Sequence, residues 1–183
     1  MLGKDYEGQD CSIARALEVV GERWTLLIVR DALYGVRRFS DFQSHLDIPK
    51  AVLSERLTGL VEQGMLERRP DPDHRGRHLY ELTAAGRDLW PVVHSLFRWS
   101  EQNRAPSNRR FRHALCGTEL DQTAACPSCR ITPPVEDVTM ELRRAHRSSR
   151  TDPVAVALVK PHRMLEPLDL AQPSVSTLGA KRS

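Results

Sequence analysis

Apolar residues recur at the spacing of an α-helix near the start of the chain. Between residues 11 and 34, Ile13, Leu17 and Val20 share one face, and Gly21 then interrupts the pattern. The same spacing restarts at Trp24, whose aromatic side chain we expect in the core. The pattern therefore predicts two helices separated by a break.

Two further helices are expected next along the chain. Residues 39–46 carry two apolar side chains four positions apart, and Ser40 followed by Gln43 fits a capping box. Residues 50–64 follow Pro49, which suits the first position of a helix. This fourth helix carries a stripe of leucines, so one of its faces should be buried and the other exposed.

The hydrophobic period changes to that of strands after the fourth helix. Residues 65–70 and 77–82 flank a turn made of Pro, Asp, His, Arg and Gly, and they predict a β hairpin. Thr83 then suits the N-cap of a long helix. Pro91 would kink that helix unless a break lies there.

Three further segments follow this helix. Residues 104–109 are rich in Pro, Ser, Asn and Arg and predict a linker, and residues 110–142 contain a group of Cys and His residues. Residues 143–183 carry prolines and many polar side chains, which is typical of a disordered tail. Within that tail, the apolar run at 153–159 could order locally.

Composition and charge narrow the class of protein. The chain has 183 residues, 40% hydrophobic and 28% charged, which is typical of a globular domain with an appendage. No apolar run approaches ~18 residues, and the first ten residues lack an apolar signal core. We therefore expect no membrane partner and a cytoplasmic location. The net charge of +3 permits a nucleic-acid partner without requiring one.

The order of helix, turn, helix and hairpin is that of a winged helix-turn-helix. The major groove of DNA admits one helix, and a hairpin at its far end can reach the backbone or the minor groove. Arg75 and Arg77 at the hairpin tip suit a narrow minor groove, where cations are favoured. A solvated turn is the alternative, because residues 67–78 carry a net charge of only +1.

The fourth helix is expected to be the recognition helix. By angular position, its outward side includes Ala51, Val52, Glu55 and Thr58, with Lys50 and Arg56 toward the flanks. Glu55 could accept a hydrogen bond from a cytosine amino group, or it could be a surface carboxylate that aids solubility. The predicted DNA-binding residues are Lys50, Ala51, Ser54, Glu55, Arg56, Thr58, Arg75 and Arg77.

Three stretches in the right order carry a resemblance to a known family. They are CSIARALEVVGERWTLLIVRDALYGVRRFSDFQSHL, LSERLTGLVEQGMLERR and YELTAAGRDL. Together they resemble the HxlR-type transcriptional regulators of bacteria over residues 8–103. The resemblance implies a winged-helix DNA-binding domain, a homodimer formed largely through the terminal helices, and a cytoplasmic regulator that represses or activates transcription.

One cysteine matches the family by position. Cys11 stands where many HxlR-type proteins have a cysteine before the first helix, and some of them use it to sense oxidants or electrophiles. The alternative for Cys11 is a small buried residue at the dimer interface. A nearby helix N-terminus favours the thiolate, whereas Asp10 beside it opposes it.

Four residues after the linker have the spacing of a metal site. His113 and Cys116 are separated by two residues, and so are Cys126 and Cys129. Two such pairs can place four N/S ligands around a structural zinc, one per chain, with sulfurs about 3.5–4 Å apart. A segment this small has little core of its own, so the metal would supply folding energy. Similar extensions occur on some HxlR-type proteins, but most of the family lacks one.

Two other interpretations of these residues are weaker. The CPSC sequence could be redox active, but no thioredoxin-like βαβ pattern surrounds it. Zinc deaminases combine H-x-E with P-C-x-x-C, and here the glutamate is missing and Ala125 replaces the proline. Cysteines in a reducing compartment favour a metal over a disulfide framework.

These observations predict a mainly α fold with a small β hairpin: a winged helix-turn-helix domain, a zinc-ribbon-like module and a disordered tail. The expected function is a homodimeric regulator bound to double-stranded DNA, with a small-molecule or oxidant effector. A protein-interaction adaptor using the same two domains is the alternative. An enzyme is not expected, since the sequence shows no nucleophile with a nearby base and no Gly-rich phosphate loop.

Overall fold

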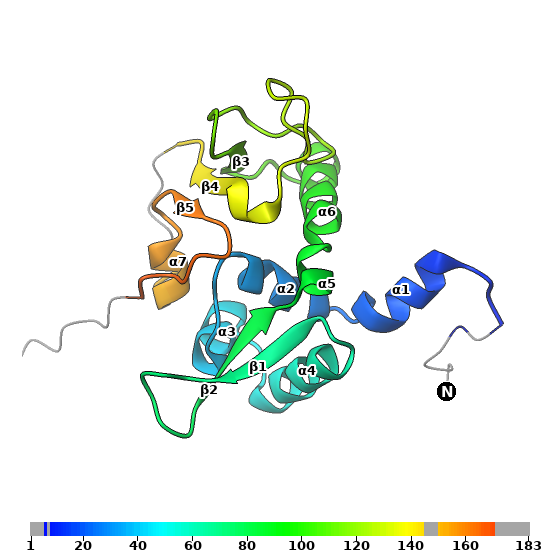
Figure 1. Ribbon diagram of the computed structural model, residues 1–183, viewed down its shortest axis with the longest axis vertical. Coiled ribbons are helices and arrows are strands. Elements are labelled where there is room, and N and C mark those ends of the chain that lie inside the picture. Colours follow the sequence, from blue (N-terminus) through cyan, green and yellow to red (C-terminus); the bar gives the residue numbers. More distant parts are fainter. Residues whose placement is uncertain (1–5, 7, 145–149, 171–183) are drawn as a thin grey trace, which may run out of the picture.

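The computed structural model describes residue 6, residues 8–144 and residues 150–170. Figure 1 shows the described chain as two stacked parts, with the N-terminal helices and a β hairpin below a small three-stranded sheet. The expected mainly α fold class, with a winged helix-turn-helix and a C-terminal Cys/His cluster, is confirmed.

The first two helices differ in how much they bury. Helix α1 (Ser12–Val20) projects away from the rest of the chain, and Ala14 is its buried residue. Helix α2 (Thr25–Leu33) lies at the centre, with Ile28, Val29 and Leu33 buried. The predicted break between them is present, since the intervening residues form no regular element. Trp24 is half-buried and packs against the core.

Helices α3 (Phe39–Leu46) and α4 (Lys50–Glu62) form the helix-turn-helix. Asp47 takes a left-handed conformation with φ of 52°, which turns the chain between them. The capping box is wrong, because α3 begins at Phe39 with Arg38 as its N-cap and makes no side-chain cap bond. The predicted proline position is off by one, since Pro49 is the N-cap of α4.

Strands β1 (Leu66–Pro70) and β2 (His78–Leu82) form the predicted antiparallel hairpin, with Leu66 opposite Leu82. The segment before α3 extends this sheet, because Tyr80 N–H donates to the Arg37 carbonyl at 2.8 Å. The hairpin is therefore anchored beside the helix-turn-helix, and its turn points away from the body (Figure 1).

The predicted long helix is divided in two. Helix α5 (Ala84–Arg87) directly follows its N-cap Thr83, whose hydroxyl accepts a hydrogen bond from Gly86 N–H. Helix α6 (Trp90–Asn103) then starts afresh with Pro91 in its first turn. Proline is tolerated there because the first N–H groups of a helix have no intrahelical partner.

The Cys/His module is built on an antiparallel sheet in the order β3-β4-β5. Strand β3 (Arg109–His113) pairs with β4 (Val138–Leu142), which follows a short 3-10 helix η1 (Val135–Asp137). Phe111 on β3 packs edge-on against Trp90 and Phe97 of α6, with ring centroids 5.0 and 5.1 Å apart. The module therefore shares a hydrophobic core with the helices.

The prediction of a disordered tail is wrong for residues 150–170. Helix α7 (Pro153–Ala157) packs on α3, and strand β5 (His162–Arg163) pairs with β4. Val154, Leu158 and Met164 are buried there, which supplies the apolar contacts that a disordered segment lacks. Residues 145–149 and 171–183 of the expected tail lie outside the described residues.

The segment 150–170, here called the strap, joins the two parts of the molecule. Leu165 N–H donates to the Leu33 carbonyl at 2.8 Å. Gly35 has a φ of 82°, and a Cβ there would overlap the carbonyl oxygen of Glu166. Only glycine permits this approach of strap to body. Among the described residues, none of the helices is long and apolar enough to span a bilayer.

Candidate nucleic-acid interface and metal cluster

Helix α4 presents an open face to solvent. Ala51, Ser54, Glu55 and Thr58 are exposed, whereas Leu53, Leu57 and Leu60 are buried against the core. Val52, expected outward, is half-buried and packs against the core instead. The buried stripe is thus wider than the leucines alone indicate, and the open face is correspondingly narrower.

Arg56 is held by carboxylates on two elements. Its Nη2 lies 3.2 Å from Glu55 Oε1 and 3.6 Å from Glu22 Oε2, which follows α1. Exposed ion pairs of this kind are worth about 0–1 kcal/mol, so a phosphate can displace them. The structure therefore places Arg56 beside the predicted recognition face, with its charge partly neutralised.

The turn of the hairpin is organised by Asp71. Its N–H donates to the Arg77 carbonyl at 2.9 Å, and its carboxylate accepts from Asp73 N–H at 2.9 Å. Arg38 Nε donates to the same carboxylate at 3.2 Å. Burial raises the pKa of Asp71, but the hydrogen bonds from Asp73 N–H and Arg38, together with the Arg38 charge, lower it more, so the pKa lies below its usual value.

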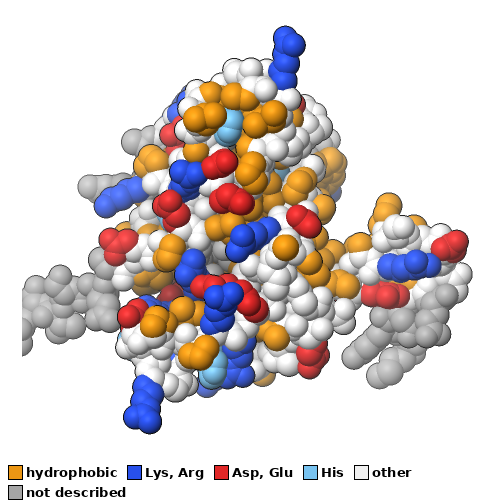
Figure 2. Space-filling model, viewed as in Figure 1, with side chains coloured by type: hydrophobic (Ala, Val, Ile, Leu, Met, Phe, Trp, Pro, Cys, Tyr) orange, Lys and Arg blue, Asp and Glu red, His pale blue; other side chains and the backbone are white. Residues whose placement is uncertain are grey.

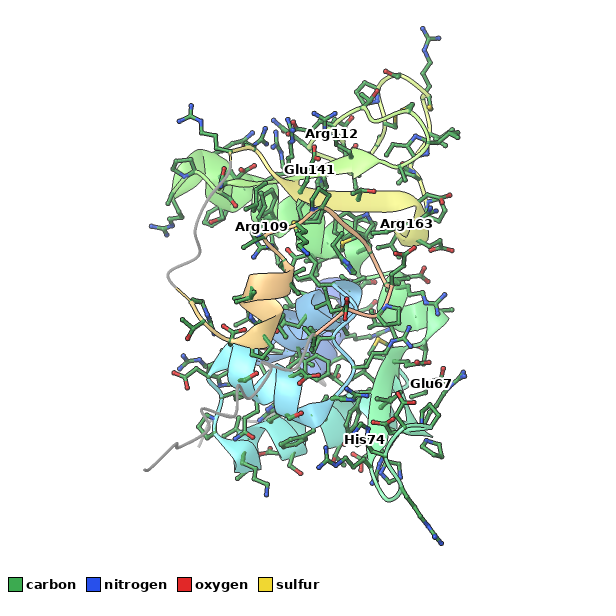
Figure 3. All side chains as sticks on the ribbon, turned by 90° about the vertical axis from the view of Figure 1, so that its left-hand side faces the viewer. Glu67, His74, Arg109, Arg112, Glu141 and Arg163 are labelled. Carbon is green, nitrogen blue, oxygen red and sulfur yellow. The ribbon has the colours of Figure 1, made fainter. Side chains whose placement is uncertain are left out.

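Arg75 and Arg77 lie exposed in this turn, where the sequence placed them. Figure 3 shows the turn, marked by His74, at the opposite end of the molecule from Arg112 and Glu141 of the upper sheet. The turn and the module therefore lie at opposite ends of the molecule.

A cleft of about 490 Å³ runs between the hairpin and the two helices of the helix-turn-helix. Its walls include Arg38, Lys50, Arg77 and His78, together with Asp71. Sequence reasoning missed Arg38 and His78. In the sequence, Arg37 and Arg38 directly before α3 could have indicated a basic surface. Their position beside the hairpin was not predictable, because it depends on the long-range pairing of Arg38 with Leu79.

The predicted metal ligands converge. His113, Cys116, Cys126 and Cys129 each bring one ligand atom to within 4.8 Å of the others. The sulfurs of Cys116 and Cys126 are 3.4 Å apart, and Cys116 Sγ is also 3.4 Å from His113 Nδ1. All the cysteines are free thiols. Three sulfurs and one imidazole at these distances can bind a tetrahedral metal ion.

Two tight turns, here called the knuckles, present these ligands. In residues 113–117 the Gly117 N–H donates to the His113 carbonyl at 2.8 Å, and in residues 126–130 the Arg130 N–H donates to the Cys126 carbonyl at 2.8 Å. Gly117 and Arg130, each directly after the second ligand, have φ of 70° and 57°. The shared geometry orients both pairs toward one point.

The thiols of the cluster differ in acidity. The hydroxyl and N–H of Thr118, with smaller contributions from the neighbouring thiols, lower the pKa of Cys116 to about 6. Hydrogen bonding to Cys116 and burial raise the pKa of Cys129 to about 11. The Cys129 N–H also donates to Cys126 Sγ at 3.5 Å, as backbone amides do toward thiolate ligands.

Cys11 lies apart from this cluster, as the half-buried N-cap residue of α1, with a free thiol. It makes no side-chain cap bond. Its position at a helix N-terminus matches the sequence expectation, and its role as a sensor stays a prediction.

Comparison with known proteins identifies the family. Residues 19–108 match the family described as HxlR-like helix-turn-helix. The uncharacterized HTH-type transcriptional regulator Rv3095 of Mycobacterium tuberculosis (strain ATCC 25618 / H37Rv) is 43% identical over 131 residues, which cover 70% of this chain and 82% of that one. YvaP of Bacillus subtilis (strain 168), also an uncharacterized HTH-type transcriptional regulator, is 34% identical over 94 residues, covering 51% and 87%.

A solved structure supports the same assignment. The crystal structure of PA1607, a candidate transcription factor, is 30% identical, covers 79% of this chain and 98% of that one, and superposes with a TM-score of 0.59. The family and these relatives are transcriptional regulators and not enzymes. The chain is thus a winged-helix transcriptional regulator that belongs to the HxlR family.

Proposed function

We propose that this regulator binds specific sequences of double-stranded DNA as a homodimer. Helix α4, over about residues 50–63, enters the major groove, and the hairpin over about residues 65–82 follows the backbone or enters the adjacent minor groove. Lys50, Ala51, Ser54, Glu55, Arg56 and Thr58 face the major groove.

The observation that carries this proposal is the basic cleft between α4 and the hairpin. Arg38 and Lys50 line one part of it, and Arg77 lines the other. The first turn of α4 holds no acidic residue, so its N–H groups and Lys50 favour a phosphate there. Arg75 extends the same positive edge to the hairpin tip, where it can reach the next stretch of backbone.

The dimer is supported by apolar surface on α1 and α6. Ile13 and Trp99 are 71% and 52% exposed, and Leu17, Val92 and Leu96 are also exposed. Figure 2 shows α1 standing clear of the body with hydrophobic side chains at its surface. Such residues are costly to leave in water, and two-fold pairing of the same surfaces buries them in both chains. A dimer also spaces two recognition helices along the duplex.

We further propose that the cluster of His113, Cys116, Cys126 and Cys129 holds one structural zinc per chain. Four protein ligands close the coordination shell, which is typical of structural rather than catalytic zinc. The ion would fix the two knuckles, whose loops contain few buried side chains.

The experiment that tests DNA binding exchanges Arg75 and Arg77 together for alanine. Promoter fragments bound by the wild type are titrated from about 50 to 200 mM salt. The slope of log K against log salt should become less negative by about 3.6 for the dimer, because the two chains together lose four phosphate contacts and each contributes about 0.9. A matched variant, Arg87→Ala with Arg144→Ala, loses the same charge at exposed positions outside the hairpin.

The outcomes separate the competing functions. An unchanged slope and affinity in the Arg75 and Arg77 variant would remove the hairpin from the interface. A wild-type protein that binds no duplex at low salt would instead favour the adaptor function, in which the same two domains dock on other proteins.

A further inference from the structure

Beyond the proposed DNA interface, the described chain contains an apolar cavity of about 320 Å³ that is partly open to solvent. It lies where α2, α6, β3 and the strap meet, with Leu27, Val93, Phe97, Phe111 and Met164 among its walls. This size falls at the small end of ligand sites, which measure roughly 300–1,000 Å³ and occur often where domains adjoin.

The shape of the apolar end favours a flat ring. Phe97 and Phe111 are perpendicular, with an interplanar angle of 86°, and Trp90 meets Phe111 at 69°. Such edge-to-face pairs leave ring faces and edges available to a further aromatic group. The cavity is thus suited to an aromatic guest more than to a polar one.

A second cavity of about 230 Å³ adjoins the first and is more polar than it. The two share four wall residues: Arg30, Tyr34, Phe97 and Ser100. Arg109 also lines the second cavity and lies over the Tyr34 ring, with its guanidinium carbon 5.4 Å from the ring centroid. Figure 3 shows Arg109 at the lower edge of the module, facing the helices.

The charged groups around the second cavity can still accommodate an anion. Arg30 Nε and Nη2 donate to Asp31 at 2.9 and 2.7 Å, but a guanidinium carries five N–H donors and can bind a second carboxylate. Glu101 also lines this end, and Arg98 holds it at 2.8 Å. His45 there is bound to Asp152 of the strap at 2.9 Å.

We propose that the two cavities together form a binding site for a small aromatic carboxylate. The ring occupies the apolar cavity between Val93 and Phe111, and the carboxylate binds Arg30, with Arg109 and Ser100 beside it. Hydrogen bonds to a charged partner are among the stronger ones in proteins, so the carboxylate supplies specificity and the ring supplies burial.

The test uses the full-length protein without DNA and two probes of matched shape. Isothermal titration with 2-naphthoate should give one site per chain. The neutral analogue 2-naphthamide should bind about tenfold more weakly, the effect expected for one lost charge-assisted hydrogen bond. Equal affinity for both probes would overturn the assignment of Arg30. No binding of 2-naphthoate would overturn the site, and this is the result expected if α1 of a partner chain fills the cavity.

Matched variants locate the site. Val93→Phe fills the apolar cavity and should abolish binding, whereas Val156→Phe makes the same change at an exposed position of α7 outside the walls of both cavities. Arg30→Gln should weaken 2-naphthoate about tenfold but leave 2-naphthamide unchanged, while Arg23→Gln removes the same charge elsewhere. Arg30 also neutralises Asp31, so Arg30→Gln could destabilise the fold. Arg30→Lys keeps a cation beside Asp31 and should therefore stay folded and retain part of the preference for 2-naphthoate over 2-naphthamide. Loss of binding in Val156→Phe but not in Val93→Phe would place the ligand elsewhere and refute the proposal.

Binding of the ligand is also expected to change the affinity for DNA, and this expectation rests on the proposed function. Helix α2 contacts α3 and β2, so a ligand against α2 touches the elements that support the recognition helix and the hairpin. Binding is measured in the absence of DNA, and the failure of this site and the failure of DNA binding are therefore distinguishable.

Discussion

Replacing Cys126 with serine is expected to release the metal and loosen the knuckles while the β3–β4 pair stays in place. Cys126 is fully buried at the centre of the cluster. Between residues 114 and 132, Leu120 and Ala124 are the other buried apolar side chains. A buried leucine contributes about 1.5–3 kcal/mol, whereas structural zinc contributes about 10–16 kcal/mol in small peptides at neutral pH. The metal therefore dominates the stability of this segment.

The strands have a separate source of stability. Phe111 packs against Trp90 and Phe97 of α6, and Val138 and Met140 are fully buried. These contacts do not depend on the cluster, so β3 and β4 should keep their protection when the ion is lost. The sequence alone predicts that the small segment over residues 110–142 depends on the metal for its folding, and the shared core narrows that expectation to the knuckles.

The assay combines elemental analysis with amide hydrogen exchange. Wild type should hold about one zinc per chain, and Cys126→Ser should hold little and exchange rapidly over residues 114–132 alone. Cys11→Ser makes the same chemical change outside the cluster and should keep its zinc. Full zinc occupancy in the Cys126 variant, or metal-free wild type, would refute the reasoning. A Cys126–Cys129 disulfide in the purified protein would favour the redox interpretation instead.

Three further predictions concern the α1 surface, the strap and Cys11. Leu17→Glu should convert the dimer to a monomer at micromolar concentration, because the new carboxylate would be buried unpaired in the proposed dimer interface on α1. Light scattering measures the mass, and a dimer mass for the variant would exclude the α1 surface from that interface. Asp152→Ala should lower the free energy of unfolding by about 1–2 kcal/mol at pH 7, since it removes the N-cap of α7 and the hydrogen bond to His45. Burial raises the pKa of Asp152, but its hydrogen bonds lower it more, so this stabilisation is present above the ordinary aspartate pKa and is lost as pH falls through the lower folded value. In urea titrations, the free energies of unfolding of wild type and Asp152→Ala should therefore converge below about pH 4, and a difference that grows there would contradict the assignment. If Cys11 senses oxidants, peroxide should release DNA from wild type but not from Cys11→Ser, and equal responses in a mobility-shift assay would assign Cys11 to packing.

Local signals along the chain predicted the winged helix well. The spacing of Phe42 and Leu46 predicted the buried face of α3, and Pro91 indicated the break that separates α5 from α6. The capping box failed because backbone geometry at Arg38, which pairs with the hairpin, decided where α3 starts. Propensity is overridden wherever such tertiary contacts compete with it.

The metal cluster was predictable from sequence because ligand spacing carries the chemistry. His113 and Cys116 lie in one knuckle, and each pair is fixed by local hydrogen bonds that any tight turn of this kind provides. The packing of the strap was not predictable in the same way. His45 meets Asp152 across 107 positions of the chain, and neither residue carries a local sign of the other.

The long-range contacts of the strap also order the events of synthesis. The Arg37 guanidinium bonds to the Leu165 carbonyl, 128 positions further along the chain. Contacts of such separation form late, and chains generally fold from the N-terminus as they leave the ribosome. The helix-turn-helix and its hairpin therefore have their residues in place well before the segment that covers Leu33 and His45 has been made. Each newly made chain can complete its fold only after the end of the strap is translated. A chain truncated before residue 150 would therefore carry the elements proposed to face DNA but leave the surface around Leu33 and His45 uncovered.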